Sequence, residues 1–284
     1  MEFLKRVLEL LDAEMETPTA FGWFHLLFIA LTVGGAVVLC LLHKKDDPDR
    51  VRRIVFITAI VVIALEIYKQ INYSFSYSGE VIEVDYHWYA FPFQFCSTPM
   101  YVGLLAGIIK KGRVHDALCT YLATYALFAG VCVMVYPGDV FIGTIGINIQ
   151  TMICHGSMIS IGAYLLYSGH VKLSHKSILG AMAVFAVCVG LASVMNEIAY
   201  FSGLLESETF NMFFISRHCE GTLPVYSLVQ QVVPFPFCLI IYIAIFSLAA
   251  YVILLAAMGI KKLSEAVRAK QSAKSEIKEV KVAH

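Results

Sequence analysis

The sequence contains few charged residues. Asp, Glu, Lys and Arg make up 15% of the 284 residues, against about a quarter in a typical soluble domain. Hydrophobic residues make up 59% of the chain. This balance excludes an ordinary soluble domain, because so many apolar side chains must face lipid as well as one another. The formal net charge of zero argues against a nucleic-acid partner.

The sequence predicts neither a secretory leader nor a metal-binding cysteine pattern. Residues 1–17 carry five acidic side chains, whereas a signal peptide has a basic start and an apolar core. We interpret this segment as a short amphipathic helix. Apolar stretches contain Cys40, Cys119, Cys132, Cys154 and Cys188, where Cys acts mostly as a small hydrophobe, and no CxxC pair occurs. We therefore expect no metal site and no cofactor.

Seven apolar stretches occupy most of the chain, and each is long enough for a helix that crosses about 30 Å of hydrocarbon. They are residues 21–43, 52–77, 91–109, 115–136, 145–168, 176–201 and 233–260. The sequence therefore predicts an all-α polytopic membrane protein with seven transmembrane helices. The predicted transmembrane domain covers residues 1–260, and a basic tail covers residues 261–284.

Lysine and arginine are nearly absent from alternate connections between these stretches. Seventeen of the 21 basic residues fall in the connections after the first, third and fifth stretches and in the tail. Three fall in the N-terminal segment and the other connections, and Lys69 lies inside a stretch. Basic residues collect on the cytosolic side of membrane proteins. This pattern predicts an external N-terminus and a cytosolic C-terminus in a multi-pass plasma membrane protein. The tail is expected to be a helical extension that is either solvated or in contact with anionic lipid.

Polar side chains inside the stretches are concentrated at the depth of the outer leaflet. At a rise of about 1.5 Å per residue, the outer half of the bundle is expected to hold His25, Glu66, Lys69, Cys96, Gln150, His155, Asn196 and Glu197. Charged groups in hydrocarbon usually mark a functional site. The sequence therefore predicts one polar cavity that opens toward the outer leaflet. The alternative is that Glu66 and Lys69, three residues apart on one helix, only pair with each other.

Cys96 lies in an unusual segment between two prolines. Pro92 is suited to the first turn of a helix, which would place Cys96 near the positive end of the helix dipole. Pro99 would then kink the helix beside the thiol. A cysteine or histidine inside a span is most often a packing residue, and composition alone does not pair Cys96 with His155. Cys154 is not expected to pair with His155 either, because neighbours on a helix diverge by about 100°.

Several short motifs resemble a known family. They are residues 21–25 (FGWFH), 66–69 (EIYK), 92–97 (PFQFCS), 154–156 (CHG) and 211–214 (NMFF). Together they resemble the YwaF-type bacterial membrane proteins, a family that is similar to the vertebrate TMEM acyltransferase that makes polyunsaturated ether phospholipids. The resemblance implies acyl transfer in which Cys96 takes an acyl chain as a thioester and His155 acts as the base. Phe91 and Gln94 depart from the Leu and His that the family pattern has at these positions.

Three functions remain open on this basis. The first is a membrane-embedded acyltransferase that moves a fatty acyl chain between phospholipid and lysophospholipid, with membrane lipids as substrates. Its catalytic residues would be Cys96 and His155, and the substrate-binding or supporting residues would be His25, Glu66, Lys69, Gln94, Gln150, Asn196 and Glu197. The second is a transporter or small-molecule-binding protein, which would tolerate mutation of Cys96. The third is a structural or assembly factor, in which the cavity would be too small for a lipid tail.

Overall fold

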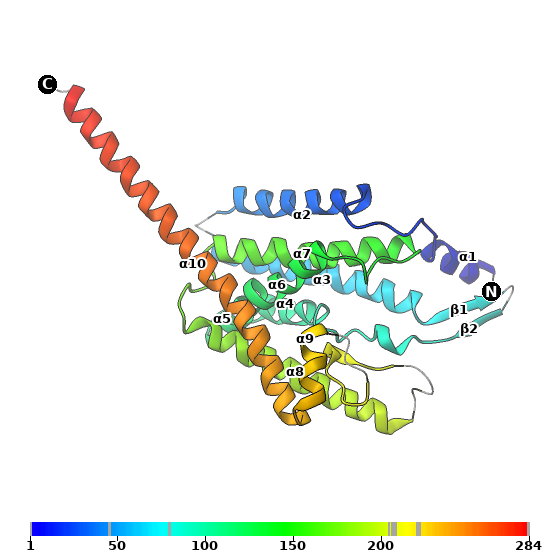
Figure 1. Ribbon diagram of the computed structural model, residues 1–284. Helices are drawn as coiled ribbons and strands as arrows, with labels where there is room; N and C mark the ends of the chain where they lie inside the picture. The colour runs from blue at the N-terminus through cyan, green and yellow to red at the C-terminus, as the bar shows by residue number, and fades with distance from the viewer. Residues whose placement is uncertain are drawn as a thin grey trace.

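The structure is a computed structural model that describes residues 2–44, 47–78, 81–203, 205, 209–219 and 223–282. Within this part of the chain it is mostly helical (Figure 1). The elements are α1 (Glu2–Leu11), α2 (Trp23–Leu41), α3 (Pro48–Asn72), β1 (Phe75–Ser78), β2 (Val81–Val84), the 3-10 helix η1 (Trp88–Ala90), α4 (Thr98–Ile108), α5 (Arg113–Tyr121), the π-helical turn η2 (Leu122–Ala126), α6 (Leu127–Val135), α7 (Ile145–Tyr167), α8 (Ser177–Ser202), the 3-10 helix η3 (Met212–Phe214), α9 (Pro224–Val232) and α10 (Phe235–Val282).

Six helices are long and apolar enough to cross a membrane. They are Trp23–Leu41, Asp49–Asn72, Arg113–Val135, Ile145–Tyr167, Ser177–Ser202 and Phe235–Ser272. These six coincide with six of the predicted stretches. The third predicted stretch, residues 91–109, contains only the 11-residue apolar helix α4. The membrane-protein class is therefore confirmed, whereas the seven crossings and their orientation stay predictions.

Helix α4 begins later than the sequence predicted. Residues 91–97 form successive turns, in which the backbone N–H of Phe93 donates to the carbonyl of Phe91 at 2.7 Å and that of Ser97 to the carbonyl of Gln94 at 2.9 Å. Pro99 lies in the first turn of α4, where its missing N–H removes no intrahelical bond. The predicted helix start at Pro92 and the predicted kink at Pro99 are therefore wrong, because Pro99 begins the helix that it was expected to bend.

Close packing between helices brings distant parts of the chain together. Helix α3 packs on α4, α2 and α6 pack on α7, and α5 packs on α8. A buried row of stacked aromatic rings crosses the centre, with ring centroids 5.4 Å apart for Tyr121 and Tyr125, 4.7 Å for Tyr125 and Phe185, and 6.0 Å for Phe185 and Tyr242. Lipid removes most of the hydrophobic driving force between helices, so such dense packing is what stabilises their association.

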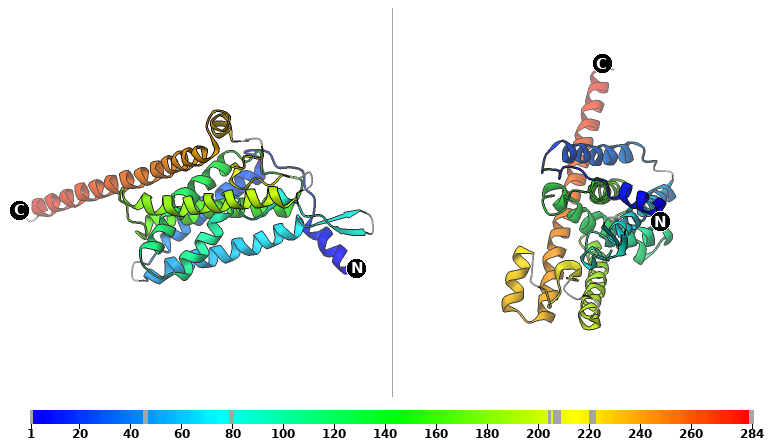
Figure 2. Two further views of the ribbon diagram at one scale, coloured as in Figure 1. Left: turned by 90° about the horizontal axis from the view of Figure 1, so that it is seen from below. Right: turned by 90° about the vertical axis from the view of Figure 1, so that its right-hand side faces the viewer.

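The two termini lie at opposite ends of the molecule (Figures 1 and 2). Helix α1, the predicted amphipathic segment, lies beside the β1–β2 hairpin at one end. The chain after α1 is attached to the start of α7, since the N–H of Met15 donates to the carbonyl of Gly143 at 2.7 Å and that of Ile145 to the carbonyl of Ala13 at 3.0 Å. At the other end α10 continues without a break through residue 261 and projects from the bundle.

Candidate functional site

A buried ion pair on α3 forms the polar centre of the bundle. The ammonium group of Lys69 lies 2.8 Å from Oε1 of Glu66, and the two side chains are 16% and 6% exposed. The side-chain amide of Gln70 donates to the same oxygen at 2.8 Å, and that of Gln150 on α7 donates to Oε2 at 3.2 Å. Glu66 and Lys69 therefore pair with each other, as the alternative in the sequence analysis proposed, and Glu66 is also bonded to Gln150 of α7. A carboxylate with three donors is held in one position.

Gln70 continues this network toward the end of α3. Its amide nitrogen donates to the carbonyl of Ala90 at 2.8 Å, and its amide oxygen accepts from the hydroxyl of Tyr86 at 2.6 Å. Burial raises the pKa of Tyr86 to about 12, and the negative charge of Glu66 adds to the increase. Tyr86 is therefore a neutral hydrogen-bond donor at physiological pH, and it connects the loop before Cys96 to the ion pair.

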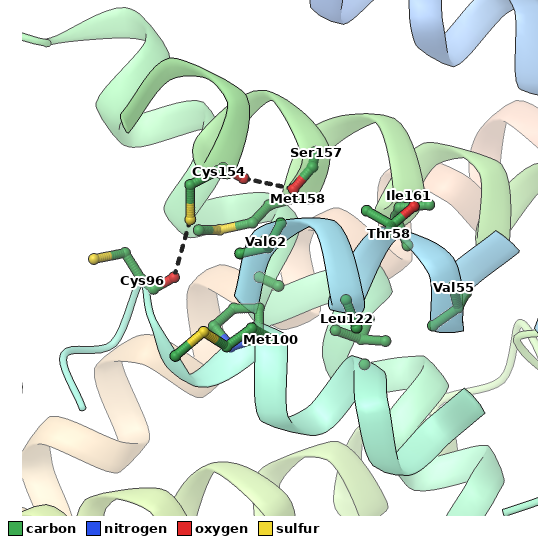
Figure 3. A pocket seen from close by; sticks show the side chains of 14 residues that line it. Val55, Thr58, Val62, Cys96, Met100, Leu122, Cys154, Ser157, Met158 and Ile161 are labelled. Atoms are coloured by element: carbon green, nitrogen blue, oxygen red, sulfur yellow. Dashed lines mark hydrogen bonds between the residues drawn. The ribbon is translucent and has the colours of Figure 1, made fainter. Parts of the chain in front are cut away.

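Cys96 lies two residues before the start of α4, in contact with α7. Its carbonyl oxygen is 3.8 Å from Sγ of Cys154. Figure 3 shows this contact, with the thiol of Cys96 pointing away from Cys154. Cys96 therefore precedes the helix that was expected to carry it, and its backbone contacts α7 at the residue before His155.

His155 has one engaged ring nitrogen and one that is free. Its Nδ1 lies 2.7 Å from the carbonyl oxygen of Thr151 one turn earlier on α7. A carbonyl only accepts, so Nδ1 carries the proton and Nε2 is the basic nitrogen. Nε2 is buried and has no hydrogen-bond partner in the described part of the chain. No hydrogen bond between described residues joins it to Cys96.

The backbone of α7 at His155 is held by α6. A Cβ atom built on Gly130 of α6 would lie 2.7 Å from the carbonyl oxygen of His155, closer than real Cβ atoms approach. Only glycine allows the two helices this separation. The position of His155 is therefore fixed by helix packing as well as by Thr151.

A narrow cleft extends from Cys96 toward the middle of the bundle (Figure 3). It is lined by residues of α3, α4, the π-helical turn and α7, among them Val62, Met100, Leu122 and Cys154. Its volume is about 30 Å³, far below the range of about 300–1,000 Å³ for ligand sites. The cleft is therefore too small for an acyl chain in this conformation.

Two predicted site residues support a loop rather than the polar centre. Gln94 donates to the carbonyl of Asn211 at 3.0 Å and accepts from the N–H of Phe213 at 2.9 Å. Asn196 donates to the carbonyl of Met212 at 3.1 Å and accepts from the N–H of the same residue at 2.8 Å. They hold the aromatic motif in place, including Phe213 with its left-handed φ of 59°.

His25 and Glu197 lie in two further groups. The N–H of Phe21 donates to Nδ1 of His25 at 2.9 Å, and Nε2 lies 3.0 Å from the carbonyl oxygen of Met134. Both ring nitrogens of His25 are thus engaged by backbone groups. Glu197 is half-buried and binds the guanidinium of Arg217 at 3.0 and 2.8 Å. The structure does not bring these two residues together with Cys96 and His155.

One thiol–imidazole contact was missed by the sequence reasoning. Sγ of Cys119 lies 3.6 Å from Nε2 of His115, one turn earlier on α5, and both residues are buried. Their spacing of four residues on one helix is the signal that would have found them. No group of three described His, Cys, Asp or Glu residues is placed to hold a metal ion.

The described architecture defines a polytopic helical membrane protein with a buried ion pair, a thiol and an unpartnered imidazole nitrogen near its centre. A model of the TMEM164 family matches residues 20–255. The chain belongs to that family. No curated protein and no solved structure matches the chain significantly.

Proposed function

We propose that this protein is an acyltransferase of the plasma membrane that moves a fatty acyl chain from a phospholipid to a lysophospholipid. Cys96 is the nucleophile and His155 is the general base. The proposal combines the polar centre with the motif resemblance. Its substrates are membrane lipids, which reach the site from the outer leaflet.

The observation that carries this proposal is the free, buried Nε2 of His155, one residue from the contact between Cys154 and Cys96. A general base needs a basic nitrogen that no other group occupies and an orientation fixed by a third group. Thr151 supplies that orientation through Nδ1. The thiol of Cys96, which points away from Cys154, has to turn toward α7 to reach Nε2.

The reaction consists of two balanced steps. First, Nε2 of His155 takes the thiol proton while Sγ of Cys96 attacks the ester carbonyl; a thioester forms, the ester bond breaks, and the proton passes to the departing lysolipid oxygen. Then Nε2 takes the proton of an acceptor lysolipid hydroxyl while the hydroxyl oxygen attacks the thioester carbonyl; a new ester forms, the C–S bond breaks, and Nε2 returns the proton to the sulfur of Cys96. The ammonium of Lys69 stabilises the thiolate, and Glu66 with Gln150 holds Lys69 in position.

Two observations favour other functions and must be tested against this one. The buried pair of Glu66 and Lys69 is also what a transporter or solute-binding protein would place in its pathway. The cleft of about 30 Å³ beside Cys96 is what a structural or assembly factor would have. In both cases Cys96 would be replaceable.

Acyl exchange between donor phospholipid and labelled lysophospholipid by purified, reconstituted protein separates these functions. Cys96→Ala and His155→Ala should each lower the exchange rate to background, whereas Cys188→Ala, a buried cysteine of α8, should keep it. Cys119→Ala tests the other thiol–imidazole pair and should also keep it. If the Cys96→Ala variant exchanged acyl chains at the rate of the wild type, the assignment of Cys96 as the nucleophile would be rejected and the transporter function would be favoured.

A further inference from the structure

A second hollow lies between α3 and α4. We call it the α3–α4 groove and define it by Ile63, Ile67 and Gln70 of α3 and by Met100, Tyr101 and Leu104 of α4. Its volume is about 420 Å³, which lies within the range of about 300–1,000 Å³ for ligand sites. The groove is open to the surface on helices that face lipid, since Ile67 is 57% exposed.

The polarity of the groove changes along its length. One end is lined by Ile63 and Leu104, at the depth of the hydrocarbon. The other end, two to three turns further along the chain, is lined by Gln70 and Ser74 together with the apolar Ile71 and Phe75, and Glu66 lies between the two ends. A groove that is apolar along its length and carries hydrogen-bonding groups near one end matches a membrane lipid, with its acyl chain along the apolar wall and its ester near Gln70 and Ser74.

The wall of the groove is attached to the segment that carries Cys96. Pro92 and Met100, four residues before and four residues after Cys96, both line the groove. The hydroxyl of Tyr101 donates to the carbonyl of Pro92 at 2.9 Å, which joins α4 to this segment. Met100 is 5% exposed and also lines the narrow cleft that begins at Cys96. Met100 therefore separates the groove from the cleft.

We infer that the α3–α4 groove binds one acyl chain of a glycerophospholipid, with the lipid ester toward Gln70 and Ser74. Its use as a donor site rests on the proposed acyltransferase function. The cleft beside Cys96 is small, with a volume of about 30 Å³, so the groove supplies the space for the chain. A rotation of the flexible Met100 side chain joins the two spaces.

Photolabelling tests this binding without requiring catalysis. Wild-type and Cys96→Ala protein are reconstituted in vesicles that contain rising fractions of phosphatidylcholine with a diazirine in its acyl tail. After irradiation, the labelled peptides are identified by mass spectrometry. Labelling of the groove residues of α3 and α4 should saturate in both proteins. Labelling at the exposed Leu191 and Val194 of α8 should rise in proportion to the probe, as contact with bulk lipid requires.

A bulky side chain in the groove provides the matched comparison. Ile67→Trp should lower the saturable labelling on the order of tenfold, whereas Leu191→Trp on α8 should leave it unchanged. Strictly proportional labelling of the groove, or saturation that survives Ile67→Trp, would overturn the inference. Saturable labelling without Cys96-dependent acyl exchange would support lipid binding in the groove and reject the acyltransferase function. Cys96-dependent acyl exchange without saturable labelling would support the acyltransferase function and reject lipid binding in the groove.

Discussion

At the residue scale, Glu66 and Lys69 show how a charged pair is accommodated within a membrane bundle. Each oxygen of Glu66 accepts at least one hydrogen bond, and the donor on Oε2 comes from α7. The pair is therefore a contact between helices as well as a local i, i+3 pair. Its removal should affect both the packing of α3 on α7 and the charge near Cys96.

Lys69→Met should destabilise the protein strongly, because it leaves the buried carboxylate of Glu66 without its counterion. Breaking one partner of a buried pair costs about 3–5 kcal/mol. The matched control is Arg53→Met, whose partner Asp47 is on the surface, with side chains 58% and 38% exposed; such a pair contributes about 0–1 kcal/mol. Thermal unfolding in detergent measures both. Equal thermal unfolding midpoints for the two variants would show that the ion pair with Lys69 does not stabilise the protein more than the surface pair does.

At the element scale, the backbone of α7 at His155 depends on its contact with α6. The fold holds the imidazole through Thr151 along α7 and through the Gly130 contact across to α6. The segment with Cys96, in contrast, is a run of turns between η1 and α4. The proposed base is thus on a helix, and the proposed nucleophile is on a segment of turns.

Gly130→Ala should lower both thermal stability and acyl exchange, because the added Cβ would contact the His155 carbonyl and push α6 away from α7. The control is Gly190→Ala in α8, where nothing lies within 4 Å of the added Cβ. Alanine is better than glycine in a helix by about 1 kcal/mol, so this variant should be unchanged or more stable. A Gly130→Ala protein as stable and active as wild type would contradict the packing argument.

At the scale of the whole molecule, the sequence predicted the positions of helices better than the directions of their side chains. Hydropathy located six of the long helices, and the fixed rise per residue put Glu66 and Gln150 at one level, where the structure joins them by a hydrogen bond. It did not determine how each helix is rotated about its axis, so His25 was expected beside the same cavity although it contacts Met134. The start of α4 was wrong because Pro92 and Pro99 are both compatible with a first helical turn, and only the backbone shows which one has it.

The predicted membrane orientation follows from basic residues that occur in alternate connections. An epitope tag at the N-terminus should be accessible to antibody in intact cells, and a tag at the C-terminus should require permeabilisation. The separation of the two termini in the fold fits opposite sides of a membrane (Figure 2). A C-terminal tag that antibody reaches in intact, sealed cells would reverse the orientation and place the polar centre toward the inner leaflet.

The acyl thioester on Cys96 is the central claim, and mass spectrometry tests it most directly. Reconstituted protein is incubated with donor phospholipid without acceptor, quenched in acid and digested. We predict an acyl adduct on the peptide that contains Cys96, which hydroxylamine removes, which is absent from Cys96→Ala and which is strongly reduced in His155→Ala. Acyl exchange at the normal rate with an unmodified Cys96 peptide, or with the adduct on Cys119, would contradict the account.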